Sequence, residues 1–237
     1  MTRRFETTNW SLVLAAAESK TPRSQEALAA LCEAYWPPVY AFIRGQGCAP
    51  EKARDLTQGY FLRLLEKHYL KDVRPEAGRF RSFLCASVKH FLANERDKEQ
   101  ALKRAADRAP LAFDVEAAEG RYVLELADEL TPERVFEKEW AATVLKRALS
   151  CLREEFAVAG KLEEFDRLKI YLTGEKPADP YKQVAEDPLI TELAVRVTVH
   201  RMRRRFGQLL REEIGHTVAT PQEIDDEVRY LLEVIGP

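Results

Sequence analysis

The stretch YKQVAEDPLITELAVRVTVHRMRRRFGQLLREEI, residues 181–214, decides the fold that we expect for this chain. Two helices are predicted in it, over 181–187 and 191–214, with a turn between them. On the second helix the apolar side chains share a stripe about 80° wide. They are Val195, Val199, Met202, Phe206 and Leu209. We expect this stripe to pack on the first helix through Val184 and Ala185, which is the pattern of a helix–turn–helix.

The other side of this second helix is rich in arginine. Residues 196–211 contain six arginines and no acidic residue. Four polar side chains lie opposite or beside the apolar stripe: Arg196, His200, Arg203 and Arg204. Such a helix can enter the major groove of DNA, where arginine binds guanine and its neighbours hold phosphates. The alternative is an ordinary surface helix with solvated arginines. Because ordinary surfaces mix the two signs of charge, the sequence favours DNA binding.

The rest of the chain also has the helical period and lacks strand-like alternation, so we expect an all-α fold of two small helical domains. Further helices are predicted from a cap at Ser24 to about Arg44, over 50–68, 79–104 and 161–173, from Thr131 onward, and over 221–235. Residues 105–131 have no sustained apolar stripe. The expected division is therefore a first domain, 1–108, an acidic linker, 109–131, and a second domain, 132–237.

The helix predicted over 79–104 carries a second basic row. Its apolar stripe is formed by Phe80, Leu84, Val88 and Phe91. From the far side project Lys89, Arg96 and Lys103, spaced seven residues apart, with Asn94 beside them. Phosphates can bind along such a row, and nearby aromatic rings can stack on unpaired bases. A solvated helix face explains the same row equally well.

The net charge hides this pattern. The 237 residues carry a formal charge of −2, but residues 1–110 hold 19 basic and 13 acidic side chains, and residues 111–175 hold 9 and 15. An acidic stretch thus separates two basic surfaces. The distribution of charge, rather than its sum, indicates nucleic-acid binding.

Several other classes of protein are not expected. The chain has no apolar run long enough to span a membrane and no clear secretory signal, so we predict a cytoplasmic protein. The four cysteines are far apart and form no CxxC pair, which favours free thiols over disulfides or zinc. No common catalytic or phosphate-binding motif occurs, and we predict neither an enzyme nor a cofactor or metal.

Seven segments together resemble a bacterial RNA polymerase sigma factor of the extracytoplasmic-function group. They are FETTNWSLVLAA (5–16), ALCEAYWPPVYAFIR (30–44), DLTQGYFLRLLEK (55–67), GRFRSFLCASVKHFLANERDK (78–98), LTPERVFEKEW (130–140), the stretch 181–214, and IDDEVRYLLEVIG (224–236). They cover nearly the whole chain, in order.

The resemblance implies roles for particular residues. The first domain would bind the clamp of core RNA polymerase and melt the promoter's minus-ten element, and the second would read the minus-thirty-five element. Clamp contacts are implied at Asp55, Gln58, Phe61 and Arg63. Contacts to the single-stranded minus-ten element are implied in the loop 71–79 and at Lys89, Asn94, Arg96 and Lys103. Contacts to the double-stranded upstream element are implied at Arg196, His200, Arg203 and Arg204. A regulatory partner such as an anti-sigma factor is a further implied possibility.

The chain also departs from the pattern of that family. Gly59 stands where an acidic residue is common, and Pro188 and Leu189 replace the usual leucine–glycine turn. Leu193 stands where a small residue is common. Two other functions therefore stay open: a stand-alone helix–turn–helix regulator, and a sigma-like protein that binds polymerase without opening promoters.

Overall fold

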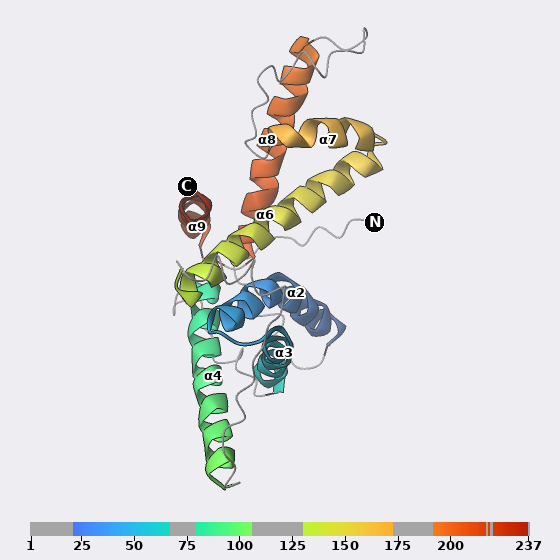
Figure 1. Cartoon of the computed structure of the whole chain (residues 1–237). Helices are drawn as coiled ribbons and strands as arrows, with labels where there is room; N and C mark the ends of the chain where they lie inside the picture. The colour runs from blue at the N-terminus through green and yellow to red at the C-terminus, as the bar shows by residue number, and fades with distance from the viewer. Residues whose placement is uncertain are drawn as a thin grey trace. The chain divides into compact units, whose positions relative to one another are not determined.

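The computed structural model describes residues 21–66, 79–105, 130–172, 192–216, 218 and 220–236. In these ranges the chain forms helices and no strand, which confirms the predicted all-α class (Figure 1). The helices are α2 (Pro22–Gly45), α3 (Pro50–Glu66), α4 (Phe80–Ala105), α6 (Pro132–Val158), α7 (Leu162–Leu168) with a short 3-10 turn (Lys169–Tyr171), α8 (Glu192–Gly215) and α9 (Pro221–Ile235). No helix within the described residues has the length and apolar character needed to cross a membrane.

The chain divides into two compact units. The first contains α2, α3, α4, the beginning of α6 as far as Thr143, and the end of the chain from Gly215 with α9. The second is Val144–Ile214, which contains the rest of α6, α7 and most of α8. These units do not coincide with the predicted domains 1–108 and 132–237, because the start of α6 and all of α9 go with the first unit. Most of the expected linker, 109–131, lies outside the described residues.

In the first unit, α2 begins at a capping box. The Thr21 hydroxyl accepts from the Ser24 backbone N–H at 3.0 Å, and the Ser24 hydroxyl accepts from that of Thr21 at 3.0 Å. Thr21, not Ser24, is therefore the N-cap. The helix continues through Pro37 and Pro38 and ends before Gly47, whose φ of +80° suits glycine.

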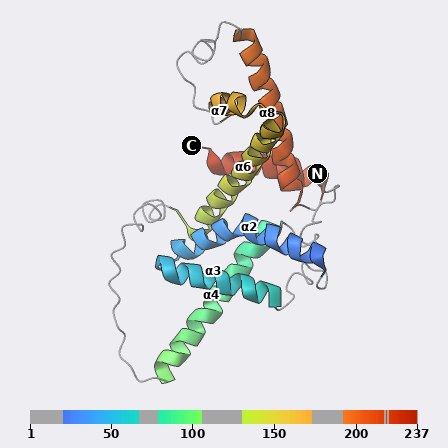
Figure 2. The ribbon, with the colours of Figure 1, turned by 90° about the vertical axis from the view of Figure 1, so that its right-hand side faces the viewer.

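The core of the first unit combines aliphatic side chains with several aromatic rings. The apolar stripe predicted on α4 is buried in full, from Phe80 to Phe91. α2 and α3 lie side by side and α4 crosses them (Figure 2). Ring contacts join the three helices: Tyr35 meets Phe80 with centroids 5.3 Å apart, and Tyr60 meets Phe91 at 5.6 Å. These contacts fix the relative positions of α3 and α4, which form the candidate site described below.

The second unit packs α8 against α6 and α7. Val195, Val199, Met202 and Leu209 of the predicted stripe are buried, and Phe206 is half-buried. Arg205 links α8 to α6, since its guanidinium donates to the Glu155 carboxylate at 2.6 Å. The expected helix 181–187 and the turn at Pro188 and Leu189 lie outside the described residues. The apolar stripe is thus confirmed, whereas the helix–turn–helix remains a prediction.

Three of the four cysteines lie on different helices, and the fourth lies between α2 and α3. Cys32, Cys48, Cys85 and Cys151 are all free and partly buried. Among the residues that the structure describes, no group of three or more histidine, cysteine or acidic side chains is placed to hold a metal ion.

Candidate nucleic-acid interface

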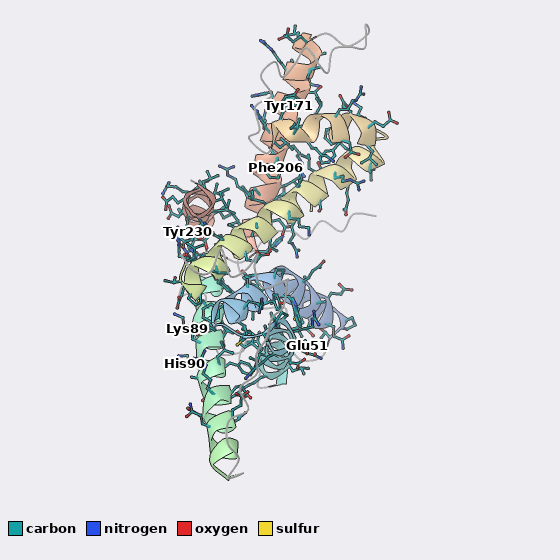
Figure 3. The ribbon with its side chains drawn as sticks, in the orientation of Figure 1. Glu51, Lys89, His90, Tyr171, Phe206 and Tyr230 are labelled. Atoms are coloured by element: carbon teal, nitrogen blue, oxygen red, sulfur yellow. The ribbon has the colours of Figure 1, made fainter. Side chains whose placement is uncertain are left out.

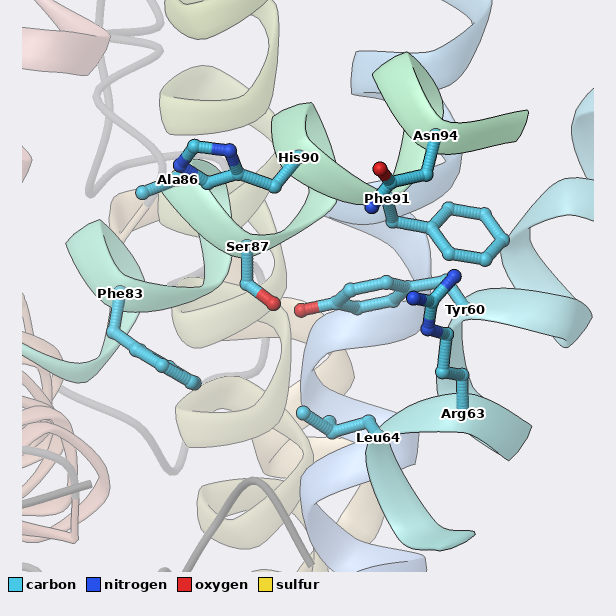
Figure 4. Close-up of a pocket in the computed structure, with 9 residues that line it drawn as sticks. All are labelled: Tyr60, Arg63, Leu64, Phe83, Ala86, Ser87, His90, Phe91 and Asn94. Atoms are coloured by element: carbon cyan, nitrogen blue, oxygen red, sulfur yellow. The ribbon is translucent and has the colours of Figure 1, made fainter. Parts of the chain in front are cut away.

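A pocket of about 360 Å³ lies between α3 and α4 (Figure 4). Three aromatic rings form much of its wall: Tyr60, Phe83 and Phe91. Ser87, His90 and Asn94 add polar groups from α4, and Arg63 adds a guanidinium from α3. The spacing explains why the α4 residues meet here. Positions 83, 87, 90 and 94 are separated by three or four residues and so fall on one helix face.

Tyr60 forms the floor of this pocket. Its ring is buried, and burial raises the pKa of its phenol above the ordinary value, with the Ser87 hydroxyl partly offsetting that effect. The two hydroxyl groups point toward each other across the floor (Figure 4). The phenol is therefore a neutral polar group near physiological pH.

Arg63 closes one side of the pocket. Its guanidinium carbon lies 5.9 Å from the centre of the Phe91 ring, and Nη1 lies 3.7 Å from Oε1 of Glu95. Aromatic walls with a few polar groups can hold a planar heteroaromatic group by stacking, with hydrogen bonds at its edge. A nucleobase has this chemistry.

The residues expected to follow the minus-ten strand lie on α4, but Lys89 lines a separate groove between α4 and α6 rather than this pocket. Asn94 lines the pocket and is exposed, as is Arg96, whose Nη2 donates to Oε1 of Gln46 at 2.9 Å. Lys89 and His90 are exposed on the same helix (Figure 3). Lys103 belongs to α4, but its side chain lies outside the described residues, as do positions 71–78 of the expected loop.

Lys89 is not free in this structure. Its Nζ lies 2.5 Å from Oε1 of Glu133, at the start of α6. This hydrogen bond raises the pKa of Lys89 and lowers the pKa of Glu133. Since both side chains are nearly half exposed, solvent weakens the pair, and it contributes well under about 1 kcal/mol.

The four residues expected to contact polymerase separate into two groups. Asp55 and Gln58 are exposed on α3 and available to a partner. Phe61 is 5% exposed, and its ring stacks on Trp36 with centroids 5.6 Å apart, so it belongs to the core. Arg63 belongs to the pocket. At Gly59 an added Cβ would lie 3.6 Å from the Phe91 ring, an ordinary contact, so packing does not require glycine there.

The arginines of α8 also differ from one another. Arg204 and His200 are exposed, and Arg196 is exposed but paired with Glu192 one turn earlier, at 2.7 Å. Arg203 has a structural task that its sequence position does not reveal. Its Nε and Nη2 donate to the Tyr171 carbonyl oxygen at 3.1 and 2.9 Å and so hold the 3-10 turn against α8. Leu193 and Val197 are exposed near the start of α8.

Two basic residues that the sequence analysis passed over are central to the fold. Arg205 ties α8 to Glu155, and Arg81 forms a buried ion pair with Glu227, 146 residues away. No local pattern marks such distant pairs. Comparisons with models of protein families, with curated proteins and with solved structures found no match for this chain.

Proposed function

We propose that this chain is a sigma-type initiation subunit that binds core RNA polymerase and opens promoter DNA. One observation carries the proposal: an aromatic-walled pocket between α3 and α4 presents His90 and Asn94 of α4 and the guanidinium of Arg63. Melting a promoter requires that at least one base leave the duplex stack and find a new stacking surface. The pocket supplies that surface, while Asn94 supplies hydrogen-bonding groups and Arg96 a positive charge.

The remaining parts have complementary roles in the proposal. The exposed basic side chains of α8, among them Arg204 and His200, would bind the duplex upstream element. Asp55 and Gln58 would contact the polymerase clamp. The two-domain sigma arrangement, with the acidic segment 109–131 as the connection, is part of the same proposal. It is supported by the resemblance of the seven sequence segments and by the all-α fold.

Removing the basic row of α4 tests the proposal. In the double variant Lys89→Ala with Arg96→Ala, we expect promoter opening to fall at least tenfold while polymerase binding is unchanged. Neither Lys89 nor Arg96 is among the residues that are expected to contact the polymerase clamp. Opening is measured by permanganate reactivity of unpaired thymines in DNA from upstream of the chain's own gene, in the presence of bacterial core polymerase.

The matched control removes two other exposed lysines. Lys98 lies on the opposite face of α4 from Lys89, nine residues along the helix, and Lys52 pairs with Glu99 at the surface. Lys52→Ala with Lys98→Ala changes the net charge equally and should leave opening close to that of the unmodified protein. Equal loss in both double variants would contradict a specific role for the row.

A further inference from the structure

The C-terminal helix α9 is strongly acidic, and one of its acidic side chains is buried against α4. Its 15 residues include five acidic side chains and one basic one. The Glu227 side chain is 2% exposed. Its carboxylate accepts from Nε and Nη2 of Arg81 at 2.7 and 3.1 Å, and Nη1 of Arg79 lies 3.4 Å away. A helix with this charge thus covers two arginines at the beginning of α4.

Arg81 is enclosed by further contacts from α6 and α9. Nη1 lies 3.6 Å from Oε1 of Glu137, and the guanidinium carbon lies 5.0 Å from the Trp140 ring and 4.1 Å from the Tyr230 ring. Burial is the largest single effect and disfavours the charged form of Arg81, but the hydrogen bond and charge of Glu227, together with Tyr230 and Glu137, outweigh it and raise the pKa. A buried charge of this kind needs an anionic partner at all times.

Lys89, two turns further along α4, is also paired with a carboxylate from another helix. It pairs with Glu133, and Arg81, Lys89, Glu133 and Glu137 line one groove of about 360 Å³ between α4 and α6. The basic side chains of α4 on this side are therefore matched by carboxylates from α6 and α9. Phosphate oxygens bind arginine through the same paired N–H groups that a carboxylate uses.

We infer that Arg79, Arg81 and Lys89 form a binding surface for the phosphates of single-stranded DNA, and that α9 is its removable acidic cover. The inference rests on the proposed function for the identity of the ligand. Glu227 and Glu133 stand where phosphates bind, so the arginines exchange one anion for another and are never left unpaired.

The test compares two charge-neutral substitutions within α9. In the full chain, Glu227→Gln removes the buried carboxylate, and Asp226→Asn removes one at the exposed surface that pairs with Arg229. The probe is a fluorescein-labelled oligothymidylate of 15 nucleotides, titrated by anisotropy over a series of KCl concentrations. We expect Glu227→Gln to bind about fivefold more tightly than Asp226→Asn. Its log–log salt slope should be steeper by about 1.4, that is about 0.7 for each of two freed arginines.

Two further variants identify the freed side chains. Adding Arg81→Gln to Glu227→Gln should remove about half of the gain in salt slope, because Arg79 alone is then freed. Glu133→Gln, at an exposed pair whose loss does not threaten folding, should increase binding about twofold through Lys89 alone. Equal affinities of Glu227→Gln and Asp226→Asn would overturn the inference, and so would a gain that is undiminished when Arg81 is also replaced.

Hydrogen exchange on the unmodified chain gives a second readout that needs no variant. Saturating oligothymidylate should speed exchange in the backbone of 221–235, because the bound strand displaces α9. If the oligonucleotide binds and exchange in this helix is unchanged or slower, α9 is not a removable cover. The proposed function is not affected by that result. If neither the unmodified chain nor any variant binds the oligonucleotide, and no promoter is opened on polymerase, the proposed function itself fails.

Discussion

At the scale of single residues, the stability of the first unit depends strongly on the buried ion pair between Arg81 and Glu227. Arg81→Ala leaves the Glu227 carboxylate buried with only Arg79 near it, so we expect the free energy of unfolding to fall by about 3–5 kcal/mol. Chemical denaturation followed by circular dichroism measures this loss. Arg229→Ala, which breaks an exposed pair with Asp226, should cost less than about 0.5 kcal/mol.

The double variant Arg81→Met with Glu227→Leu separates the charge from the packing. Apolar side chains of similar size remove both buried charges at once, and most of the stability lost in Arg81→Ala should return. If the single and double variants are equally unstable, the ion pair is not the reason for the loss.

Tyr60 makes the stability of the fold sensitive to alkali. Because burial raises the pKa of Tyr60, the folded state keeps the phenol proton more tightly than the unfolded state does. The contribution is complete below the unfolded pKa of about 10 and is lost as pH rises above it, by at most about 1.4 kcal/mol per pH unit. Guanidinium denaturation between pH 9 and pH 11 should therefore show a smaller decline in Tyr60→Phe. The same decline in both proteins would assign it to other groups.

At the scale of the element, α8 combines a structural arginine with other arginines that are exposed. Arg203→Ala removes two hydrogen bonds to the Tyr171 carbonyl, and we expect a loss of about 1–3 kcal/mol in unfolding free energy. Arg204→Ala, on the same helix and equally charged, should leave stability within about 0.5 kcal/mol. Both should weaken binding to the duplex upstream element. Equal stability of the two variants would contradict the assigned role of Arg203.

Helices and their buried stripes were predictable from the sequence, because the helical period is a local signal. The α4 stripe from Phe80 to Phe91 is an example, as is the α8 stripe from Val195 to Leu209, apart from the half-buried Phe206. The start of α2 was placed too late, since Thr21 and Ser24 are both good caps and the capping box uses both. The local sequence alone does not show which of the two residues is the N-cap.

The partners of the charged residues were not predictable. Lys89 and Arg203 were both expected to face DNA, yet one is paired with Glu133 and the other with the Tyr171 carbonyl. Each pairing joins helices far apart in the sequence, and periodicity carries no information about such contacts. The pocket escaped detection for the same reason. Its residues on α4 were visible as one face, but Tyr60 and Arg63 reach it only through the packing of α3.

At the scale of the whole molecule, α9 belongs to the first compact unit and not to the second domain in which the sequence analysis placed it. The sequence suggested a C-terminal helix within a second domain, 132–237, whereas the ion pair between Arg81 and Glu227 joins it to the first unit. The helix that is expected to contact unpaired DNA is thereby connected to the end of the chain.

Binding and initiation with core polymerase test the central claim most directly. The full chain is mixed with bacterial core RNA polymerase, and the mixture is separated by size exclusion and then supplied with DNA from upstream of the chain's own gene. The account predicts elution as an equimolar complex and transcripts that depend on the chain. Absence of binding to polymerase, with retained binding to duplex DNA, would contradict it and favour a stand-alone regulator.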